Sequence, residues 1–263
     1  MVKPTILRPG NGIGGIGKPA MTPAMHLAHK TRIRMHSIFE SISGEAGTFP
    51  QGSWVTFVRL QGCNLHCAWC DTAESRPALL LSPVDMPTVL EVAEQIVALG
   101  NRLIVITGGE PTEQMEALRI LANVLIVDHH CAVQIETNGS NPIPSNPYGH
   151  RLLTWVMDYK TPSSGMQDRM QDLLVQGEVG QLAAQGVTII KFVIADENDL
   201  LFFLDWAKQM KSGLPLPLGL ALSPTPEMVD EIPEMVDIIR REFPAMKDFC
   251  FFSVQLHKLL GMA

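Results

Sequence analysis

The chain has 263 residues, of which 46% are hydrophobic and 18% charged, with a formal net charge of −7. This composition is typical of a globular protein and excludes a disordered chain, and the negative charge disfavours a general nucleic-acid or anionic-membrane surface. Five cysteines, three of them clustered, favour thiolate metal ligands in a reducing compartment over an extracellular disulfide framework. The longest apolar stretches, such as residues 187–195, are too short to span a bilayer, and no secretory signal is visible, so we expect a cytoplasmic protein.

The first 32 residues are rich in proline and glycine and lack hydrophobic periodicity, which predicts a flexible N-terminal extension. Within them, residues 10–15 match the pattern G-x-G-x-x-G of dinucleotide-binding loops. Such a loop needs a strand before it and a helix after it, whereas Pro9 and Pro19 flank this one, so the pattern does not indicate a nucleotide site. Residues 33–263 are predicted to form a single domain.

Residues 33–39 fit either a short strand or a helical turn, and residues 53–60 fit a buried strand with one exception, Arg59 near its carboxyl end. A buried guanidinium needs a carboxylate or phosphate partner. That partner is either an acidic residue of the protein or an anionic substrate.

The loop after this strand carries Cys63, Cys67 and Cys70 in the spacing C-x3-C-x2-C. Soft thiolate ligands crowded into one short loop can hold a metal or an iron–sulfur cluster. Four thiolates would close a structural site, whereas three leave one metal position open for a reacting molecule. The loop is therefore the first candidate for a reactive centre.

Further along the chain, short apolar segments alternate with segments of helical periodicity. One predicted strand runs into residues 108–111, Gly-Gly-Glu-Pro, where two glycines allow a ligand to approach the backbone closely. Six strands alternating with helices predict a parallel sheet with right-handed crossovers, whose active site lies at the carboxyl ends of the strands. The predicted strands cover residues 53–60, 102–107, 132–136, 153–157, 187–194 and 216–222, and the predicted helices cover 87–100, 113–127, two short stretches within 167–185, 196–211 and 227–242.

The cysteine loop resembles the cluster motif of the radical S-adenosylmethionine (SAM) superfamily, and residues 108–111 resemble its methionine-binding glycine motif. Longer blocks resemble the 7-carboxy-7-deazaguanine synthases within that superfamily; they are residues 39–45, 57–65, 69–72, 136–139, 158–160 and 254–258. The resemblance implies an α/β fold, a partial (β/α)6 TIM-like barrel of the radical SAM type. It also implies a [4Fe–4S] cluster on the thiolates of Cys63, Cys67 and Cys70, with SAM bound at the open iron.

The reaction implied by the resemblance is the radical-mediated ring contraction of 6-carboxy-5,6,7,8-tetrahydropterin to 7-carboxy-7-deazaguanine, with loss of ammonia. It would make the chain a carbon–nitrogen lyase in the biosynthesis of queuosine-type modified nucleosides of tRNA. The implied catalytic residues are Arg59, which would clamp the substrate carboxylate, and Glu45, in the loop that reads the pterin edge. Thr72 would reach a Mg²⁺ ion near that carboxylate, or is a simple turn hydroxyl.

Further contacts to cofactor and substrate follow from the same resemblance. The residues expected to contact SAM are Trp69, Asp71, Gly108, Gly109, Glu110, Glu136, Asp158, Lys160 and Ser223. The residues expected to contact the substrate are Ile42, Ser43, Gly44, Arg59, Thr107 and, through the terminal carboxylate, Ala263. For Glu136, a bond to a ribose hydroxyl and a simple turn cap both stay open. The chain departs from the usual Ser-Ile-Gln-Gly-Glu-Gly loop of the family at Ser43 and Ala46, which leaves a related pterin-like substrate open.

The implied partners are an electron donor such as flavodoxin and a second copy of the chain in a homodimer, without a membrane or direct nucleic-acid contact. One alternative is an activase that generates a glycyl radical on a partner protein, because such enzymes share the cluster loop. Another is a non-catalytic zinc module held by the three cysteines, in which the glycine motif would have no purpose.

Overall fold

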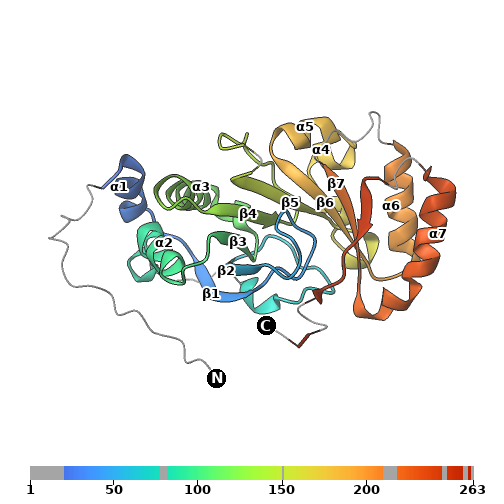
Figure 1. Ribbon diagram of the computed structural model, residues 1–263, viewed down its shortest axis with the longest axis horizontal. Coiled ribbons are helices and arrows are strands. Elements are labelled where there is room, and N and C mark those ends of the chain that lie inside the picture. The colour runs from blue at the N-terminus through green and yellow to red at the C-terminus, as the bar shows by residue number, and fades with distance from the viewer. Residues whose placement is uncertain are drawn as a thin grey trace, which may run out of the picture.

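The computed structural model describes residues 21–77, 82–149, 151–209, 218–244, 248–256 and 260–261, and shows a curved sheet with helices packed along its outer side (Figure 1). The sheet has eight strands in the order β1 to β8; β1 pairs with β2 in antiparallel fashion, and all other neighbours are parallel. Because β1 and β8 are its two edges, the barrel is partial and open. The strands are β1 (Met35–Ile42), β2 (Trp54–Leu60), β3 (Leu103–Gly108), β4 (Ala132–Thr137), β5 (Leu153–Tyr159), β6 (Val187–Ile194), β7 (Gly219–Pro224) and β8 (Cys250–Phe252).

The helices follow the strands in the predicted alternation, and the six predicted strands are confirmed as β2 to β7. The α-helices are α1 (Pro23–Lys30), α2 (Val89–Ala98), α3 (Met115–Asn123), α4 (Asp172–Val175), α5 (Val179–Ala184), α6 (Glu197–Gln209) and α7 (Ile232–Glu242). Short 3₁₀ turns cover Ala73–Ser75, Pro83–Asp85, Pro111–Gln114, Pro162–Ser164, Gln167–Arg169 and Pro226–Glu231, and Val124–Asp128 continues α3 as a π-helical turn. Helix α2 begins with a capping box, in which Thr88 and Glu91 each bond the other's backbone N–H.

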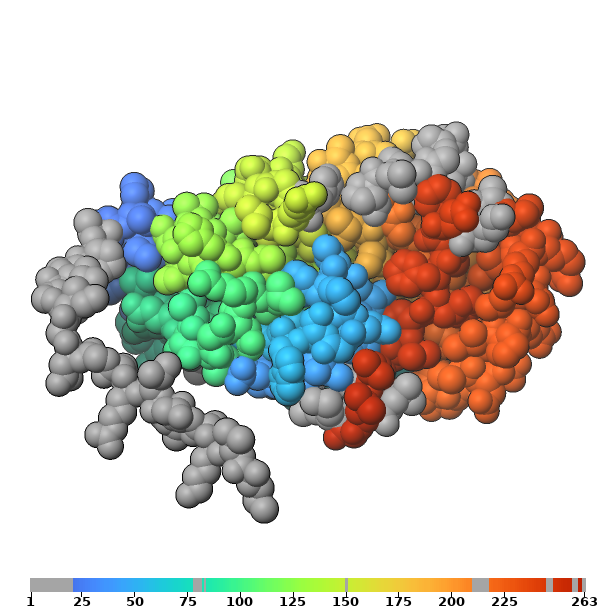
Figure 2. Space-filling view, viewed as in Figure 1, coloured from blue at the N-terminus to red at the C-terminus, as the bar shows by residue number. Residues whose placement is uncertain are grey.

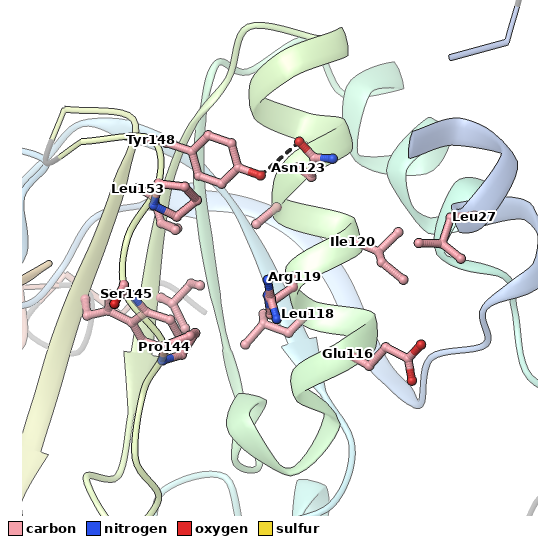
Figure 3. A pocket seen from close by; sticks show the side chains of 14 residues that line it. Leu27, Glu116, Leu118, Arg119, Ile120, Asn123, Pro144, Ser145, Tyr148 and Leu153 are labelled. Atoms are coloured by element: carbon pink, nitrogen blue, oxygen red, sulfur yellow. Dashed lines mark hydrogen bonds between the residues drawn. The ribbon is translucent and has the colours of Figure 1, made fainter. Parts of the chain in front are cut away.

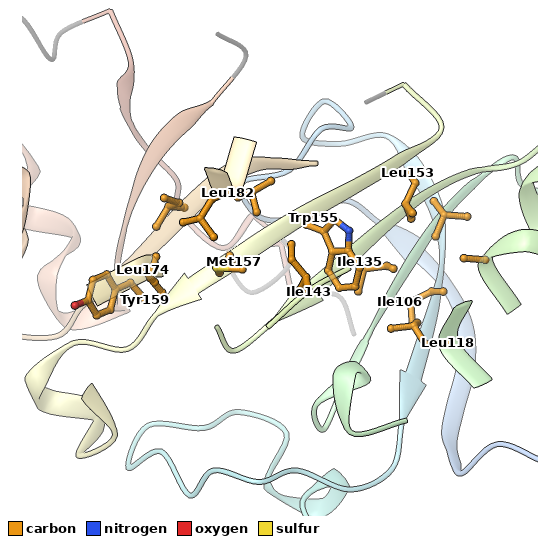
Figure 4. Close-up of a cluster of buried hydrophobic side chains, with 14 of the residues drawn as sticks. Ile106, Leu118, Ile135, Ile143, Leu153, Trp155, Met157, Tyr159, Leu174 and Leu182 are labelled. Atoms are coloured by element: carbon orange, nitrogen blue, oxygen red, sulfur yellow. The ribbon is translucent and has the colours of Figure 1, made fainter. Parts of the chain in front are cut away.

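The strands carry different chemistry on their two faces, because successive side chains of a strand point to opposite sides. On the outer face of β4 and β5, Ile135, Trp155 and Met157 pack into the main hydrophobic core (Figure 4). The residues that directly follow Ile135 and Met157, Glu136 and Asp158, line a cavity on the inner face. The alternation therefore places charged groups inside the partial barrel and the apolar core outside it.

The connection between β1 and β2 lies on the inner face of the sheet. Ala46 packs against Val156 and Ile189, and the backbone N–H of Thr48 donates to Gln134 Oε1 at 2.7 Å. These contacts fix the loop across the inside of the partial barrel, against the inner face of the central strands β4, β5 and β6.

Helix α1 was not predicted: its residues were expected to belong to a flexible extension without secondary structure. The Thr22 side chain accepts a hydrogen bond from the backbone N–H of Met25 and so caps the helix, while Pro23 occupies the first turn. Ala28 is completely buried in the main core, against which the helix packs. An eight-residue helix is too short to show a clear period in the sequence, and residues 1–20 lie outside the described part of the chain, so the predicted domain limits stay a prediction.

Among the described residues, no helix combines the length and the apolar character that crossing a membrane would require.

Candidate functional site

Two adjoining cavities lie on the inner face, at the carboxyl ends of the strands. The larger cavity has a volume of about 440 Å³ and the smaller cavity about 90 Å³. The residues that line both are Glu45, Asp71, Thr72, Thr107 and Glu136. Of the predicted site residues, those that line only the larger cavity are Cys63, Cys67, Trp69, Cys70, Gly108, Gly109, Asp158, Lys160 and Ser223. Those that line only the smaller cavity are Ile42, Ser43, Gly44 and Arg59. Glu110 lines neither cavity, and Ala263 lies outside the described residues.

The cysteine loop is held in place by residues on both sides of it. Arg76 Nη2 donates to the carbonyl oxygen of Cys67 at 2.7 Å, and the backbone N–H of Cys63 donates to the carbonyl of Arg76 at 3.0 Å. Asn138 Nδ2, at the end of β4, lies 3.8 Å from Cys63 Sγ. These bonds orient the loop so that its three thiols face one cavity.

The donor set fits an iron–sulfur cluster. Burial raises the pKa of the thiols of Cys63 and Cys67, and the Lys160 ammonium opposes that rise at Cys67. In the described ranges, no group of three or more His, Cys, Asp and Glu side chains is arranged to hold a single metal ion. A [4Fe–4S] cluster makes a different demand, because each thiolate binds a separate iron atom. Of the five cysteines, only three line the larger cavity, which matches a cluster with one open iron.

The glycine motif brings the end of β3 against the entry to the cysteine loop. A Cβ atom at Gly108, which has a φ of +110°, would lie 2.4 Å from the backbone nitrogen of Leu60. A Cβ atom at Gly109 would lie 2.1 Å from the carbonyl oxygen of Gly62. Only glycine fits both positions, so the backbone itself forms this part of the cavity wall.

Glu110 was predicted to contact the cofactor, but its side chain is surrounded by hydrogen-bond donors of the protein itself. Its side chain is fully buried and accepts hydrogen bonds from the Thr112 hydroxyl at 2.6 Å, the Thr137 hydroxyl at 2.7 Å and the backbone N–H of Asn138 at 2.7 Å. The backbone N–H of Thr112 donates as well, at 3.0 Å. Burial raises the pKa of this carboxyl, and the hydrogen bonds oppose the rise. Glu110 therefore joins the glycine motif to the end of β4.

Replacing Glu110 by glutamine is expected to lower the free energy of unfolding by roughly 2–3 kcal/mol, because the amide group cannot accept all four donors and leaves buried groups unpaired. Urea unfolding of the protein measures this change. Glu116→Gln on the exposed face of α3 is the control and should stay within about 0.5 kcal/mol of the parent. Equal stabilities of the two variants would contradict the assigned role.

Charged side chains form a row of ion pairs across the inner face. Lys191 Nζ lies 2.8 Å from Glu45 Oε2 and 3.2 Å from Asp158 Oδ1. Lys160 Nζ lies 2.6 Å from Asp158 Oδ2, and 5.1 Å from the centroid of the Trp69 ring. The row therefore connects the loop after β1 with the cysteine loop.

The four groups keep their charges in spite of their burial. Burial would raise the pKa of Glu45 and of Asp158, but the neighbouring ammonium groups hold both below their ordinary values. Burial would lower the pKa of Lys191, but Asp158 and Glu45 hold it well above its ordinary value. Lys191 was not among the predicted site residues. It is the only charged residue in the apolar segment 187–194, and a lone charge in such a segment indicates that a partner of opposite charge lies nearby.

Glu136 behaves differently from these paired carboxylates. Burial raises its pKa to about 7, while the nearby Lys191 opposes the rise. Gln134 Nε2 donates to its Oε1 at 3.2 Å. The group therefore titrates near neutral pH, between the two cavities.

Replacing Glu136 by glutamine is expected to remove a pH-dependent part of the stability. The folded-state pKa is raised, so the protonated carboxyl stabilises the fold fully below about pH 4.5, and this contribution is lost as the pH rises through about 7. The parent should therefore lose on the order of 2–3 kcal/mol of unfolding free energy between about pH 5 and pH 8, and the variant should not show this loss. Urea unfolding at both pH values tests this; a difference that does not change with pH would show that Glu136 titrates normally.

Arg59 lines the smaller cavity, and within the described part of the chain its charge has no partner at ion-pair distance. Its guanidinium carbon lies 4.8 Å from the centroid of the Phe39 ring, and its Nε is buried without a hydrogen-bond partner. Arg59 forms no ion pair with any residue in the described part of the chain. Although Glu45, Asp71 and Glu136 line the same cavity, none of these carboxylates forms an ion pair with Arg59.

The C-terminal segment contacts the loop after β1. Gln255 Nε2 donates to Glu45 Oε1, and the backbone N–H of Leu256 donates to the carbonyl of Gly44 at 2.8 Å. Gln51 Nε2 donates to the carbonyl of Val254 at 3.1 Å. Figure 2 shows the two segments against each other, the loop in light blue and the C-terminal segment in red. Gln255 belongs to a block that carried the resemblance, but sequence alone assigned it no role, because its partner is 210 positions away.

Comparison with known proteins gives consistent results. The sequence model of the Radical SAM superfamily matches residues 57–145, which include the cysteine loop and the glycine motif. Over 235 residues the chain is 30% identical to the 7-carboxy-7-deazaguanine synthase of Methanospirillum hungatei, covering 89% of this chain and 88% of that protein. Over 237 residues it is 32% identical to the 7-carboxy-7-deazaguanine synthase of Hyperthermus butylicus, covering 89% and 95%.

A solved structure shares the fold. The crystal structure of QueE from Escherichia coli aligns with a TM-score of 0.66 and 21% sequence identity, covering 90% of this chain and 99% of that chain. This likeness concerns the arrangement of strands and helices and supports the partial barrel predicted for the chain.

Proposed function

Since this chain belongs to the 7-carboxy-7-deazaguanine synthase family of the radical SAM superfamily, we propose that it converts 6-carboxy-5,6,7,8-tetrahydropterin to 7-carboxy-7-deazaguanine with loss of ammonia. The proposed reaction class is that of a carbon–nitrogen lyase.

The observation that carries this proposal is the unpaired Arg59 in a cavity next to the three thiols. A half-buried guanidinium that pairs with no described carboxylate is available to a carboxylate of the substrate, to which it offers a rigid fork of donors that matches two oxygens. The substrate carboxylate would then lie beside Asp71 and Thr72, between the arginine and the cysteine loop.

When bound, the cluster and SAM supply one electron and an organic radical that takes a hydrogen atom from the substrate. The residues of the chain bind, orient and shield. Arg59 holds the carboxylate, and the pair of Lys191 with Glu45 fixes the loop that covers the pterin. Phe39 and Phe57, whose rings stack with centroids 5.4 Å apart, line the smaller cavity and exclude water from the reacting atoms.

Three further features belong to the proposal. A Mg²⁺ ion is bound by the Thr72 hydroxyl together with the substrate carboxylate, because Mg²⁺ prefers few protein oxygens and several waters. A small electron-transfer protein such as flavodoxin reduces the cluster. The chain works as a homodimer.

The test is anaerobic turnover of the reconstituted, reduced protein with SAM, magnesium and 6-carboxy-5,6,7,8-tetrahydropterin, followed by mass spectrometry. We expect four irons per chain and a product whose mass corresponds to the loss of ammonia. Cleavage of SAM at a rate that the pterin does not change, without this product, would contradict the proposed substrate and favour an activase. A colourless protein that binds zinc would contradict the radical chemistry altogether.

A further inference from the structure

The connection from β4 to β5 has two ends with different surroundings. At its far end, the Tyr148 hydroxyl donates to Asn123 Oδ1 of helix α3 at 2.9 Å, beside a cavity of about 380 Å³ (Figure 3). Glu116 and Arg119 both line that cavity, so its lining favours neither an anionic nor a cationic ligand. At its near end, directly after β4, residues 138–140 contact the cysteine loop.

The side-chain amide of Asn138 is held in one orientation. Its Oδ1 accepts a hydrogen bond from the backbone N–H of Ser140 at 3.0 Å. A backbone N–H can only donate, so the atom that faces it must be the amide oxygen, and the NH₂ group of the amide faces the other way. The Ser140 hydroxyl donates to the same oxygen at 2.7 Å. The direction of the amide is therefore set by the backbone of the connection.

Three side chains close a ring of hydrogen bonds at this point. Asn138 Nδ2 donates to Oδ1 of Asn64 in the cysteine loop at 2.9 Å, and Asn64 Nδ2 donates to Ser140 Oγ at 2.8 Å. The bond from the Ser140 hydroxyl to Asn138 completes the ring. The ring uses one of the two N–H bonds of the Asn138 amide, so the second is available to another acceptor.

The acceptor for this second N–H is the sulfur of Cys63. Asn138 Nδ2 lies 3.8 Å from Cys63 Sγ, and the backbone N–H of Leu65 donates to the same sulfur at 3.4 Å. Asn138 is only 8% exposed, and its backbone N–H donates to Glu110 Oε2 at 2.7 Å. The amide is therefore anchored on both sides and little exposed to water, which strengthens its hydrogen bonds.

We propose that Asn138 is a positioning residue for the iron–sulfur cluster, and that its amide stabilises the reduced cluster through a hydrogen bond to the Cys63 thiolate. Such a bond strengthens as the cluster gains negative charge, so it raises the reduction potential. The electron that cleaves SAM then enters the cluster more readily. The inference rests on the cluster part of the proposed function and not on the pterin.

The experiment is an EPR-monitored redox titration of the reconstituted full-length protein without SAM or pterin. Asn138→Ala is expected to lower the equilibrium constant for one-electron reduction about 10-fold, which is a midpoint potential about 59 mV more negative. Asn138→Asp keeps the shape of the side chain and the oxygen that faces Ser140. It cannot donate and it adds a negative charge, so the potential should fall at least as far.

Ser140→Ala is the matched control. It removes one bond of the same ring, but the backbone N–H of residue 140 still holds the amide oxygen of Asn138. The bond from the amide to Cys63 is therefore kept, and this variant should have the potential of the parent.

A measurement on the unaltered protein keeps the test valid if the Asn138 variants do not retain the cluster. With nitrogen-15 in the side-chain amides of asparagine, pulsed EPR of the reduced cluster should show a coupling to an amide nitrogen. Asn64→Ala removes the other asparagine of the ring, and the coupling should remain in this variant.

An unchanged potential in Asn138→Ala would overturn the proposal, and so would the absence of the nitrogen coupling. An equal shift in Ser140→Ala would overturn it as well, because the ring would then act only through the shape of the cysteine loop. Neither experiment contains the pterin, so their failure would leave the proposed substrate untouched, and failure of pterin turnover would leave the role of Asn138 untouched.

Discussion

Arg59→Ala is expected to lower kcat/KM for the pterin on the order of 100- to 1,000-fold, the largest effect on activity of any single change considered. Arg59 is half-buried, its Nε has no hydrogen-bond partner, it makes no ion pair with a described residue, and it lines the smaller cavity, so the proposed charge partner is the substrate carboxylate. Truncating one member of a desolvated, hydrogen-bonded charge pair removes a few kcal/mol of interaction, which corresponds to this loss. Anaerobic turnover at several pterin concentrations measures it.

A second readout separates this role from a general defect. Reductive cleavage of SAM without pterin should persist in Arg59→Ala, because the cysteine loop and the glycine motif do not depend on the arginine. Arg59→Lys should recover only part of the activity, since a single ammonium cannot replace the two-pronged contact. Arg240→Gln serves as the control for loss of a positive charge. Full activity of Arg59→Ala would place the substrate carboxylate elsewhere.

Lys191→Met is expected to lower the free energy of unfolding by roughly 3–5 kcal/mol, because it leaves the largely buried carboxylate of Glu45 without its cation and removes one of the two cations beside Asp158. The pKa of Glu45 would then rise because burial would act without its opposing charge, whereas Asp158 would keep the ammonium group of Lys160. Methionine fills a similar volume, so the change tests the charge more than the packing. Urea unfolding near neutral pH measures the effect.

A matched exposed pair provides the control. Lys208 lies 3.5 Å from Asp205 on the surface of α6, and Lys208→Met should cost no more than about 1 kcal/mol. The double variant Lys191→Met with Glu45→Gln should recover part of the lost stability, because the stranded charge of Glu45 is removed. If Lys191→Met were as stable as Lys208→Met, the row of ion pairs would have no structural role.

The sequence predicted the parts of the fold that repeat along the chain. Strands β2 to β7 and their helices follow from alternating periods, and the three thiols follow from their spacing. The edge strands β1 and β8 were harder to predict from the sequence, because residues 33–39 fit a helical turn as well as a strand and β8 has only three residues. Helix α1 was missed because its signals, a threonine cap and a proline, lie within a Pro/Gly-rich segment.

The contacts at the site that could not be predicted from the sequence share a physical cause: the partners lie far apart along the chain. Glu110 was predicted to contact the cofactor, yet two of its four donors come from Thr137 and Asn138 at the end of the next strand. Lys191 was overlooked because its partner Glu45 is 146 positions earlier in the chain. Periodicity and local motifs report which residues share a face, but not which charge on that face compensates which other.

The contact between the loop after β1 and the C-terminal segment has a consequence for synthesis on the ribosome. Glu45 leaves the exit tunnel 210 residues before Gln255, which at typical elongation rates is roughly 10–40 s. During that interval the loop lacks the hydrogen bonds to its backbone and carboxylate that fix it in the finished protein. The smaller cavity, which Glu45 lines, is therefore among the last parts of the nascent chain to mature, and an affinity tag is better placed at the N-terminus than beside this late-arriving segment.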